Sequence, residues 1–290
     1  MNLQTDRLVD SALEKYRLPV WVRPYVYRYV RENPISAVKY AISLVDVKRK
    51  KGEITKTQVR LPNGTTFNMA SVLKLLNLFF YGEESMARIE EAWATKSLDR
   101  NAEYERRFLE ISVLDMRRTR ALKNLAEGLG HSVGEQPKSL EKAFERISKI
   151  DSWHDRVITT GIILRYSYAA TFGIIFYKVF YPVSPEFMRS FSKAFEDKGT
   201  ERWDTEEARR LIAENVVERE HVLKLARGIL SNVLWSIEAN MKLARELKLE
   251  REVRLLSDIS IVYPFQVLSE MGLDVDPDRE LRGIRKLSSK

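Results

Sequence analysis

A helical pattern that runs from Asp204 to Leu247 constrains the fold of this chain more than any other stretch. It contains no proline, and Asp204 with Glu207 three residues later resembles a capping box at its start. Apolar residues recur every three or four positions, as on one face of an α-helix. The predicted core-facing residues are Ile212, Val216, Leu223, Leu230, Leu234 and Ile237. The pattern predicts one long helix around which the other elements pack.

Further helical patterns precede and follow this stretch. They span residues 68–94, 100–128, 138–181 with a pause near Asp151, about 185–195, and 251–271. The most apolar part is 157–181, where Arg165 and Lys178 leave only a dozen uncharged residues between them. A membrane-spanning helix needs about 20 consecutive apolar residues. We therefore expect a buried central helix and no transmembrane segment.

The first 67 residues follow a different pattern. Two or three short helices are predicted up to about residue 47, and β-type residues then flank the turn signal Asn63-Gly64. This predicts a β-hairpin over 53–67. The expected fold is mainly α: an up-down four-helix bundle over 68–272, a small helical and hairpin segment over 1–67, and a frayed basic tail over 273–290.

The composition limits the cellular compartment and the kinds of chemical site that are expected. The chain has no Cys, which excludes disulfides and thiolate metal sites and is typical of a reducing cytoplasm. The N-terminus lacks a cationic flank followed by an apolar run, so no signal peptide is expected. Heavy use of Glu, Lys and Arg suggests a thermophilic source. Serine-nucleophile, phosphate-loop and dinucleotide-binding signatures are not found.

Positive charge is concentrated at the N-terminal side. Residues 1–68 hold 13 Lys and Arg against 6 Asp and Glu, whereas the remaining 222 residues hold 36 against 35. Aromatic residues alternate with arginines in the sequence WVRPYVYRYVR, and a run of lysines follows. The candidate cations are Arg23, Arg28, Arg31, Lys48, Arg49, Lys50, Lys51, Lys56 and Arg60.

Clustered cations attract phosphate and aromatic rings stack on bases, so this segment is a candidate nucleic-acid interface. The same residues suit a protein partner or an anionic lipid surface. They also fit a helix whose tyrosines pack inward while its arginines face solvent. Whether the chain forms a homo-oligomer is left open.

Two of the three histidines close a carboxylate-x-x-His motif, namely Asp151-x-x-His154 and Glu218-x-x-His221. Residues three apart share a helix face, so each motif can offer an oxygen and an imidazole nitrogen to one ion. Two such motifs with two further carboxylates make the metal site of di-iron carboxylate bundles.

The segment EYERRFLEISVLDMRRTRALKNLAEGLGH resembles a helix of the ferritin-like superfamily, with a mid-helix acidic residue and a Gly-rich stop. The resemblance covers about residues 68–250. It implies one or two iron or manganese ions and oxidase or oxygenase chemistry on an unknown substrate. The implied ligands are Glu218, His221, Asp151, His154, Glu110, Asp115 and Glu84.

The chain departs from that pattern in one helix. Asp115-x-x-Arg118 stands where the family has Glu-x-x-His, and arginine cannot bind a metal ion. Antiparallel pairing would place Glu84, Asp115 and the Asp151/His154 motif at one level with Arg118, as a buried ion-pair network.

The other departures concern the motifs themselves. Ser152 with Asp155 forms a capping box, so Asp151 and His154 also fit an ordinary helix start. A continuous helix from His154 to Tyr181 rises about 40 Å, which would place His154 and His221 at opposite ends of the bundle. They could share a site only if the chain between 182 and 203 crosses back along the bundle as an extended connection. The alternative function is therefore a metal-free bundle that binds nucleic acid or protein through the basic segment.

Overall fold

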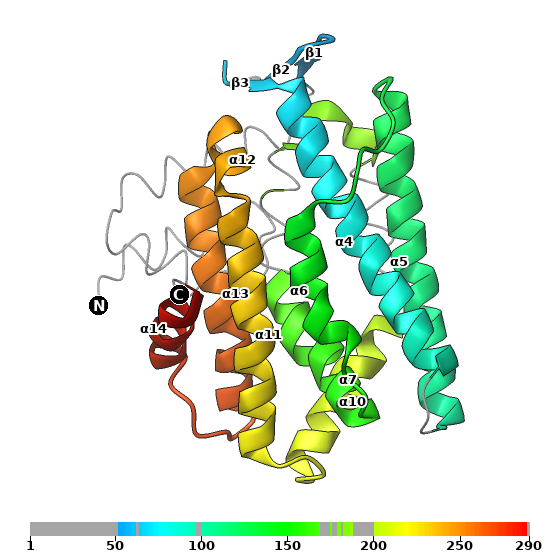
Figure 1. The fold of residues 1–290 in the computed structure, drawn as a ribbon, viewed down its shortest axis with the longest axis vertical. Coiled ribbons are helices and arrows are strands. Elements are labelled where there is room, and N and C mark those ends of the chain that lie inside the picture. The colour runs from blue at the N-terminus through cyan, green and yellow to red at the C-terminus, as the bar shows by residue number, and fades with distance from the viewer. Residues whose placement is uncertain are drawn as a thin grey trace, which may run out of the picture.

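The computed structural model describes residues 52–61, 64–96, 100–168, 175, 179–180, 182–187 and 200–288. Long helices pack side by side with a small sheet at one end (Figure 1). The helices are α4 (Met69–Lys96), α5 (Ala102–Gly128), α6 (Lys138–Ser148), α7 (Trp153–Ile158), the π-helix η2 (Thr159–Leu164), α10 (Thr200–Ala213), α11 (Arg219–Ala239), α12 (Met241–Glu246), α13 (Glu250–Glu270) and α14 (Pro277–Ser288).

The sheet confirms the predicted hairpin and adds a third strand. Strands β1 (Glu53–Ile54), β2 (Gln58–Arg60) and β3 (Thr66–Asn68) are antiparallel in that order. Val59 pairs with Phe67, and both side chains are buried on the face that covers the helices. Because β3 leads directly into α4, the sheet closes one end of the molecule (Figure 1).

Helices α4 and α5 form the hairpin that the sequence predicts. Asn101 caps α5 by accepting hydrogen bonds from the backbone N–H groups of Glu103 and Tyr104, each at 3.2 Å. Gly130, at φ 77°, lies directly beyond its end. The two helices make the most extensive helix–helix contact in the described part of the chain and lie at its edge (Figure 1).

The predicted pause near Asp151 is confirmed. Helix α6 ends at Ser148, and Ser152 caps α7 by accepting from the Asp155 backbone N–H at 3.4 Å. The chain then passes into η2, whose six residues are all buried. Of the predicted helix that follows Ser184, only residues up to 187 are described.

The single helix predicted over 204–247 is wrong. Helix α10 ends at Ala213, and a turn at 214–218 separates it from α11. Asn215 adopts φ 52°, the Val216 N–H donates to the Leu211 carbonyl at 2.9 Å, and the Asn215 N–H donates to Ile212 at 3.2 Å. These bonds form a helix-ending motif that needs a left-handed residue, which asparagine tolerates. Val216, predicted in the core, is therefore exposed.

The C-terminal tail also differs from the prediction. Helix α13 confirms the pattern at 251–271, and Gly272 ends it at φ 87°. The tail predicted to be frayed forms α14, where Asp276 accepts from the backbone N–H groups of Asp278 and Arg279. Ile284 is buried against α11 and α13, so the apolar face of this short helix outweighs its basic composition.

Two apolar clusters fill the interior. One lies toward the sheet and includes α4, the end of α5, and Ile175, Val179, Phe180 and Val183; the other includes α6, α7, η2, α10 and α11. The described part of the chain is thus mainly helical with one small antiparallel sheet. No helix in that part is long and apolar enough to cross a membrane.

Candidate functional site

Six charged side chains meet inside the molecule between α4, α5, α10 and the residues that follow η2. We call them the buried charged cluster: Glu83, Glu90, Asp115, Arg118, Arg165 and Asp204. The four carboxyl groups and Arg118 are buried, and Arg165 is partly buried. Charged groups are rarely buried unless they are paired, so this is the most unusual chemical feature of the described interior.

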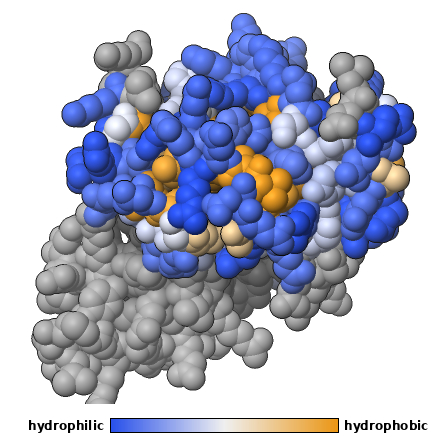
Figure 2. Space-filling view, turned by 90° about the horizontal axis from the view of Figure 1, so that it is seen from below, coloured by the Kyte–Doolittle hydropathy of each residue, from blue (hydrophilic) through white to orange (hydrophobic). Residues whose placement is uncertain are grey.

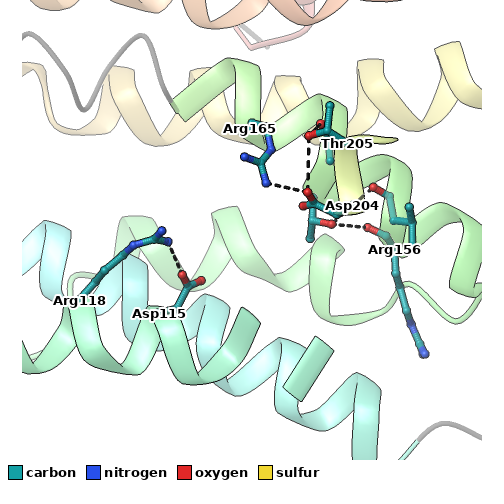
Figure 3. A network of polar contacts seen from close by, with 9 residues as sticks. Asp115, Arg118, Arg156, Arg165, Asp204 and Thr205 are labelled. Carbon is teal, nitrogen blue, oxygen red and sulfur yellow. Dashed lines mark hydrogen bonds and ion pairs between the residues drawn. The ribbon is translucent and has the colours of Figure 1, made fainter. Parts of the chain in front are cut away.

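Half of the cluster lies between α4 and α5. Arg118 follows Asp115 by one helical turn, and its Nη1 atom donates to Asp115 Oδ1 at 2.5 Å (Figure 3). The same nitrogen lies 3.9 Å from Glu83 Oε2 across the helix pair. The Arg118 guanidinium therefore lies within ion-pairing distance of both the Asp115 and the Glu83 carboxyl groups.

The other half lies where α10 begins. Arg165 Nη2 donates to Asp204 Oδ1 at 2.6 Å, and the Thr205 hydroxyl lies 3.5 Å from the same oxygen (Figure 3). The Thr160 hydroxyl also bonds this carboxylate. Asp204 is thus held from two sides.

Glu90 joins the two halves. Its carboxyl group interacts electrostatically with Asp115 and Arg118 of one ion pair and with Asp204 of the other. Its Oε2 atom is buried and makes no hydrogen bond to a described residue. An ionised carboxylate in that position would be poorly solvated, so the neutral acid is the favoured form.

Burial controls the protonation of these carboxyl groups. It raises the pKa of Glu83 to about 8, with repulsion from Asp115 adding to the rise and Arg118 opposing it. It raises the pKa of Asp115 to about 6 against the pull of Arg118, and the pKa of Glu90 well above its usual value. Burial also raises the pKa of Asp204, opposed mainly by Arg165. The cluster therefore holds protons near neutral pH.

A close backbone contact positions Asp204. A Cβ atom on Gly161 would overlap the carbonyl oxygen of Asp204, so only glycine lets α10 begin against η2. The Thr205 hydroxyl donates to the Gly161 carbonyl at 3.1 Å and fastens the same contact. The π-helical turn around Gly161 is a rare conformation that occurs often at functional sites.

Three of the predicted metal ligands, Glu84, Glu110 and Asp115, lie on α4 and α5, and each forms an ion pair with an arginine. Glu84 is half-buried and accepts from Arg88 at 2.9 Å. Glu110 accepts from Arg106 at 2.6 Å and from Arg107 at 3.2 Å.

Asp115 is in the cluster as predicted, so the ion-pair network is confirmed for Asp115 and Arg118. Glu83, not Glu84, supplies its α4 carboxyl group.

The two carboxylate-x-x-His motifs lie near one another, which contradicts the expected separation of their histidines. His221 Nε2 lies 3.0 and 2.9 Å from the two carboxylate oxygens of Asp155, directly after His154. The error has a physical cause, because the turn at 214–218 starts α11 beside the start of α7.

Within the motifs themselves the ligands do not converge. Asp151 is exposed before α7, and His154 is half-buried near Glu207. The pKa of Glu207 is lowered mainly by Arg210, and His154 contributes a smaller part of that effect. Glu218 is not mid-helix: it is the exposed residue that precedes α11, so it does not share a helical face with His221.

Figure 2 shows the surface at this end of the molecule, toward which the α10–α11 turn points in Figure 1. Polar side chains surround a few apolar patches. Val216 in that turn is one of the exposed large apolar residues.

The residues present do not fit a di-iron or di-manganese centre. The implied ligands Glu84, Glu110 and Asp115 are bound by arginines, and His221 is bound by Asp155. Among the described residues no group of three or more His, Asp or Glu is arranged to hold a metal ion.

Most of the predicted anion-binding residues lie outside the described residues, namely Arg23, Arg28, Arg31, Lys48, Arg49, Lys50 and Lys51. Lys56, in the turn between β1 and β2, and Arg60, in β2, are described and exposed. Arg60 lies 4.0 Å from Glu53, a solvent-exposed pair that holds it weakly.

Sequence reasoning missed Glu83, Glu90, Arg165 and Asp204 as site residues. A signal for two of them existed. Glu83 and Glu90 are seven residues apart, on the helix face that also carries buried Leu76 and Ala87. An acidic residue in register with an apolar stripe indicates a buried carboxyl group.

No protein-family model matches this chain, and no curated protein matches its sequence.

Proposed function

We propose that this protein is a helical-bundle scaffold that works without a metal centre and binds nucleic acid through its basic N-terminal segment, residues 1–68. In this proposal the helices form a ferritin-like four-helix bundle in which Arg118 takes the place of a metal ligand. The bundle supplies a stable platform, and the basic segment supplies the interaction.

The uneven charge of the chain carries the proposal. Residues 1–68 have an excess of seven positive charges, and the remaining 222 residues have an excess of one. An excess of this size within 68 residues attracts the phosphate backbone, and the aromatic residues that alternate with arginines in WVRPYVYRYVR suit base stacking. Two of these cations are described: Lys56 in the β1–β2 turn and Arg60 in β2 are both exposed at the end of the molecule that carries the sheet.

The buried charged cluster supports the metal-free part of the proposal. Arg118 lies 2.5 Å from Asp115 and 3.9 Å from Glu83, so its guanidinium supplies the positive charge that a metal ion supplies in a carboxylate bundle. A metal ion in the same space would add further charge beside that cation.

Binding to labelled single-stranded RNA and DNA at two salt concentrations tests the interaction. If about five of the cations contact phosphates, affinity should fall about 100-fold between about 50 mM and 200 mM salt. Replacing the run Lys48, Arg49, Lys50 and Lys51 by Gln should weaken binding at low salt and flatten the salt dependence.

A matched control removes the same number of charges elsewhere. Gln at Lys123, Lys224, Arg282 and Lys286, all exposed, should leave binding almost unchanged. Equal loss of binding in both variants would show that net charge alone attracts the nucleic acid. Stoichiometric iron or manganese that is lost in a His221→Ala variant would refute the metal-free scaffold.

A further inference from the structure

Helix α5 carries an apolar strip on its outer face. Of the five exposed large apolar residues in the described part of the chain, three follow one another on this helix: Leu109, Val113 and Met116, at 40%, 51% and 45% exposure. Spacings of four and three residues place them on one line along the helix. Scattered exposed apolar residues are common, whereas three in line mark a contact surface.

A shallow groove of about 600 Å³ lies over the strip, since Leu109 and Val113 are among the residues that line it. It is lined by α5 residues that include Arg106, Glu110, Leu114 and Arg117. Helix α5 packs on α4 and α10 with its other faces, so the groove and the strip both lie on its outer side.

One acidic and one basic residue beside the strip, Glu110 and Arg117, can pair reciprocally with an identical helix. Glu110 and Arg117 are seven residues apart on the same flank, about 10 Å along the axis, with Val113 and Leu114 between them. A twofold axis beside Val113 and Leu114 would place Glu110 of each copy opposite Arg117 of the other. A parallel pair would instead oppose like charges.

The ion pairing of Glu110 and Arg117 within one chain leaves both side chains able to pair with a second copy. Arg117 makes no ion pair with a described residue. Glu110 already accepts from Arg106 and Arg107, but a carboxylate has room for a further donor. Each copy thus offers, on the same flank of the strip, one exposed cation without an ion pair among the described residues and one acceptor.

We propose that the outer face of α5 is a self-association surface, on which a second copy of this chain docks antiparallel about a twofold axis near Val113. The contact from Ala102 to Arg120 is about 28 Å long and about 10 Å wide. This is smaller than a standard interface of about 800 Å² per partner, so the dimer should be weak, with a Kd in the micromolar range or above.

Sedimentation velocity of the full chain over a range of concentrations tests the surface. From about 1 µM to about 300 µM the weight-average mass should rise above the 33.8 kDa of one chain. Val113→Glu should raise the dimer Kd at least tenfold. Val216→Glu is a matched control, since Val216 is 45% exposed in the α10–α11 turn, and it should dimerise as the parent does. A parent chain that stays monomeric throughout, or a dimer that survives Val113→Glu, overturns the proposal.

Charge exchange tests the antiparallel register. Arg117→Glu should weaken the dimer at least tenfold, and Arg117→Glu combined with Glu110→Arg should restore it to within about threefold. A double variant as weak as the single one overturns the reciprocal pairing.

Site-specific cross-linking provides a second measurement. Because the chain has no Cys, a single Val113→Cys substitution gives one attachment point per copy. A short bismaleimide should join two Val113→Cys chains and leave Val216→Cys chains unjoined. Equal yields from the two variants contradict a twofold axis at Val113.

Discussion

Replacing Glu83 by Gln should stabilise the protein at neutral pH and have no effect in acid. Burial raises the pKa of Glu83 from 4.5 to about 8, so the folded chain keeps a proton that the unfolded chain releases above pH 4.5. Stability from this group is therefore fully present below pH 4.5 and is lost as the pH rises toward 8. A glutamine has the shape of the protonated acid and no proton to lose.

The size of the effect follows from the width of that pH window. A pH of 7 is 2.5 units above the pKa of Glu83 in the unfolded chain. Each unit is worth about 1.4 kcal/mol, so Glu83→Gln should gain about 3 kcal/mol of stability. In a chain of 290 residues this corresponds to a rise in Tm of about 5–10 °C.

Thermal and urea unfolding at pH 4, 5.5, 7 and 8 measures the difference between the variant and the parent. Glu84→Gln is the control, because it removes only a half-exposed ion pair with Arg88, worth about 0–1 kcal/mol. A Glu83→Gln advantage that is equal at pH 4 and pH 8, or a loss of stability at pH 8, would refute the assignment of Glu83 as a buried neutral acid.

Three further substitutions test other parts of the fold. Gly161→Ala should cost about 1–3 kcal/mol in urea unfolding because its methyl group overlaps the Asp204 backbone, whereas Gly82→Ala, in open space on α4, should stabilise by about 0.5–1 kcal/mol. Arg118→Met should cost about 3–5 kcal/mol at pH 7, since the ionised Asp115 carboxylate loses its cation, and less at pH 5, below its pKa of about 6, where Asp115 as well as Glu83 holds a proton; an equal cost at both pH values would argue against that pairing. Asn215→Gly should change stability by a few tenths of a kcal/mol and Asn215→Val should lower it by about 1–2 kcal/mol, because φ is 52° there; equal thermal stability of the two would contradict the left-handed turn.

Local patterns were sufficient to predict the hairpin, α4, α5 and α13. Each has a strong stop or turn signal, such as Asn63-Gly64, the Gly128-Leu129-Gly130 stop or Gly272, beside a regular apolar repeat. Where the apolar repeat continues through a break, periodicity misleads. The turn at Asn215 interrupts a sequence whose apolar spacing and helix propensity stay helical, and only its hydrogen bonds reveal the stop.

The candidate site was harder to predict because it depends on which face each residue occupies. Glu83 and Glu84 are neighbours of one type, yet one is buried against Arg118 and the other is half-exposed beside Arg88. Asp204 and Arg165 are 39 residues apart, and no local pattern connects them. Sequence motifs also overstated the histidines, because a three-residue spacing binds one ion only if both residues share a helix.

The contact between Gly161 and Asp204 also bears on how relatives of this chain can be recognised. Apolar positions in a helical bundle exchange freely among Leu, Ile, Val and Met, so they identify a lineage poorly. Three residues of this contact are far less interchangeable: Gly161 in the π-helical turn, Arg165 four residues later, and Asp204, which Arg165 binds. True relatives should therefore keep Gly161, Arg165 and Asp204 together, even where the surrounding sequence has diverged.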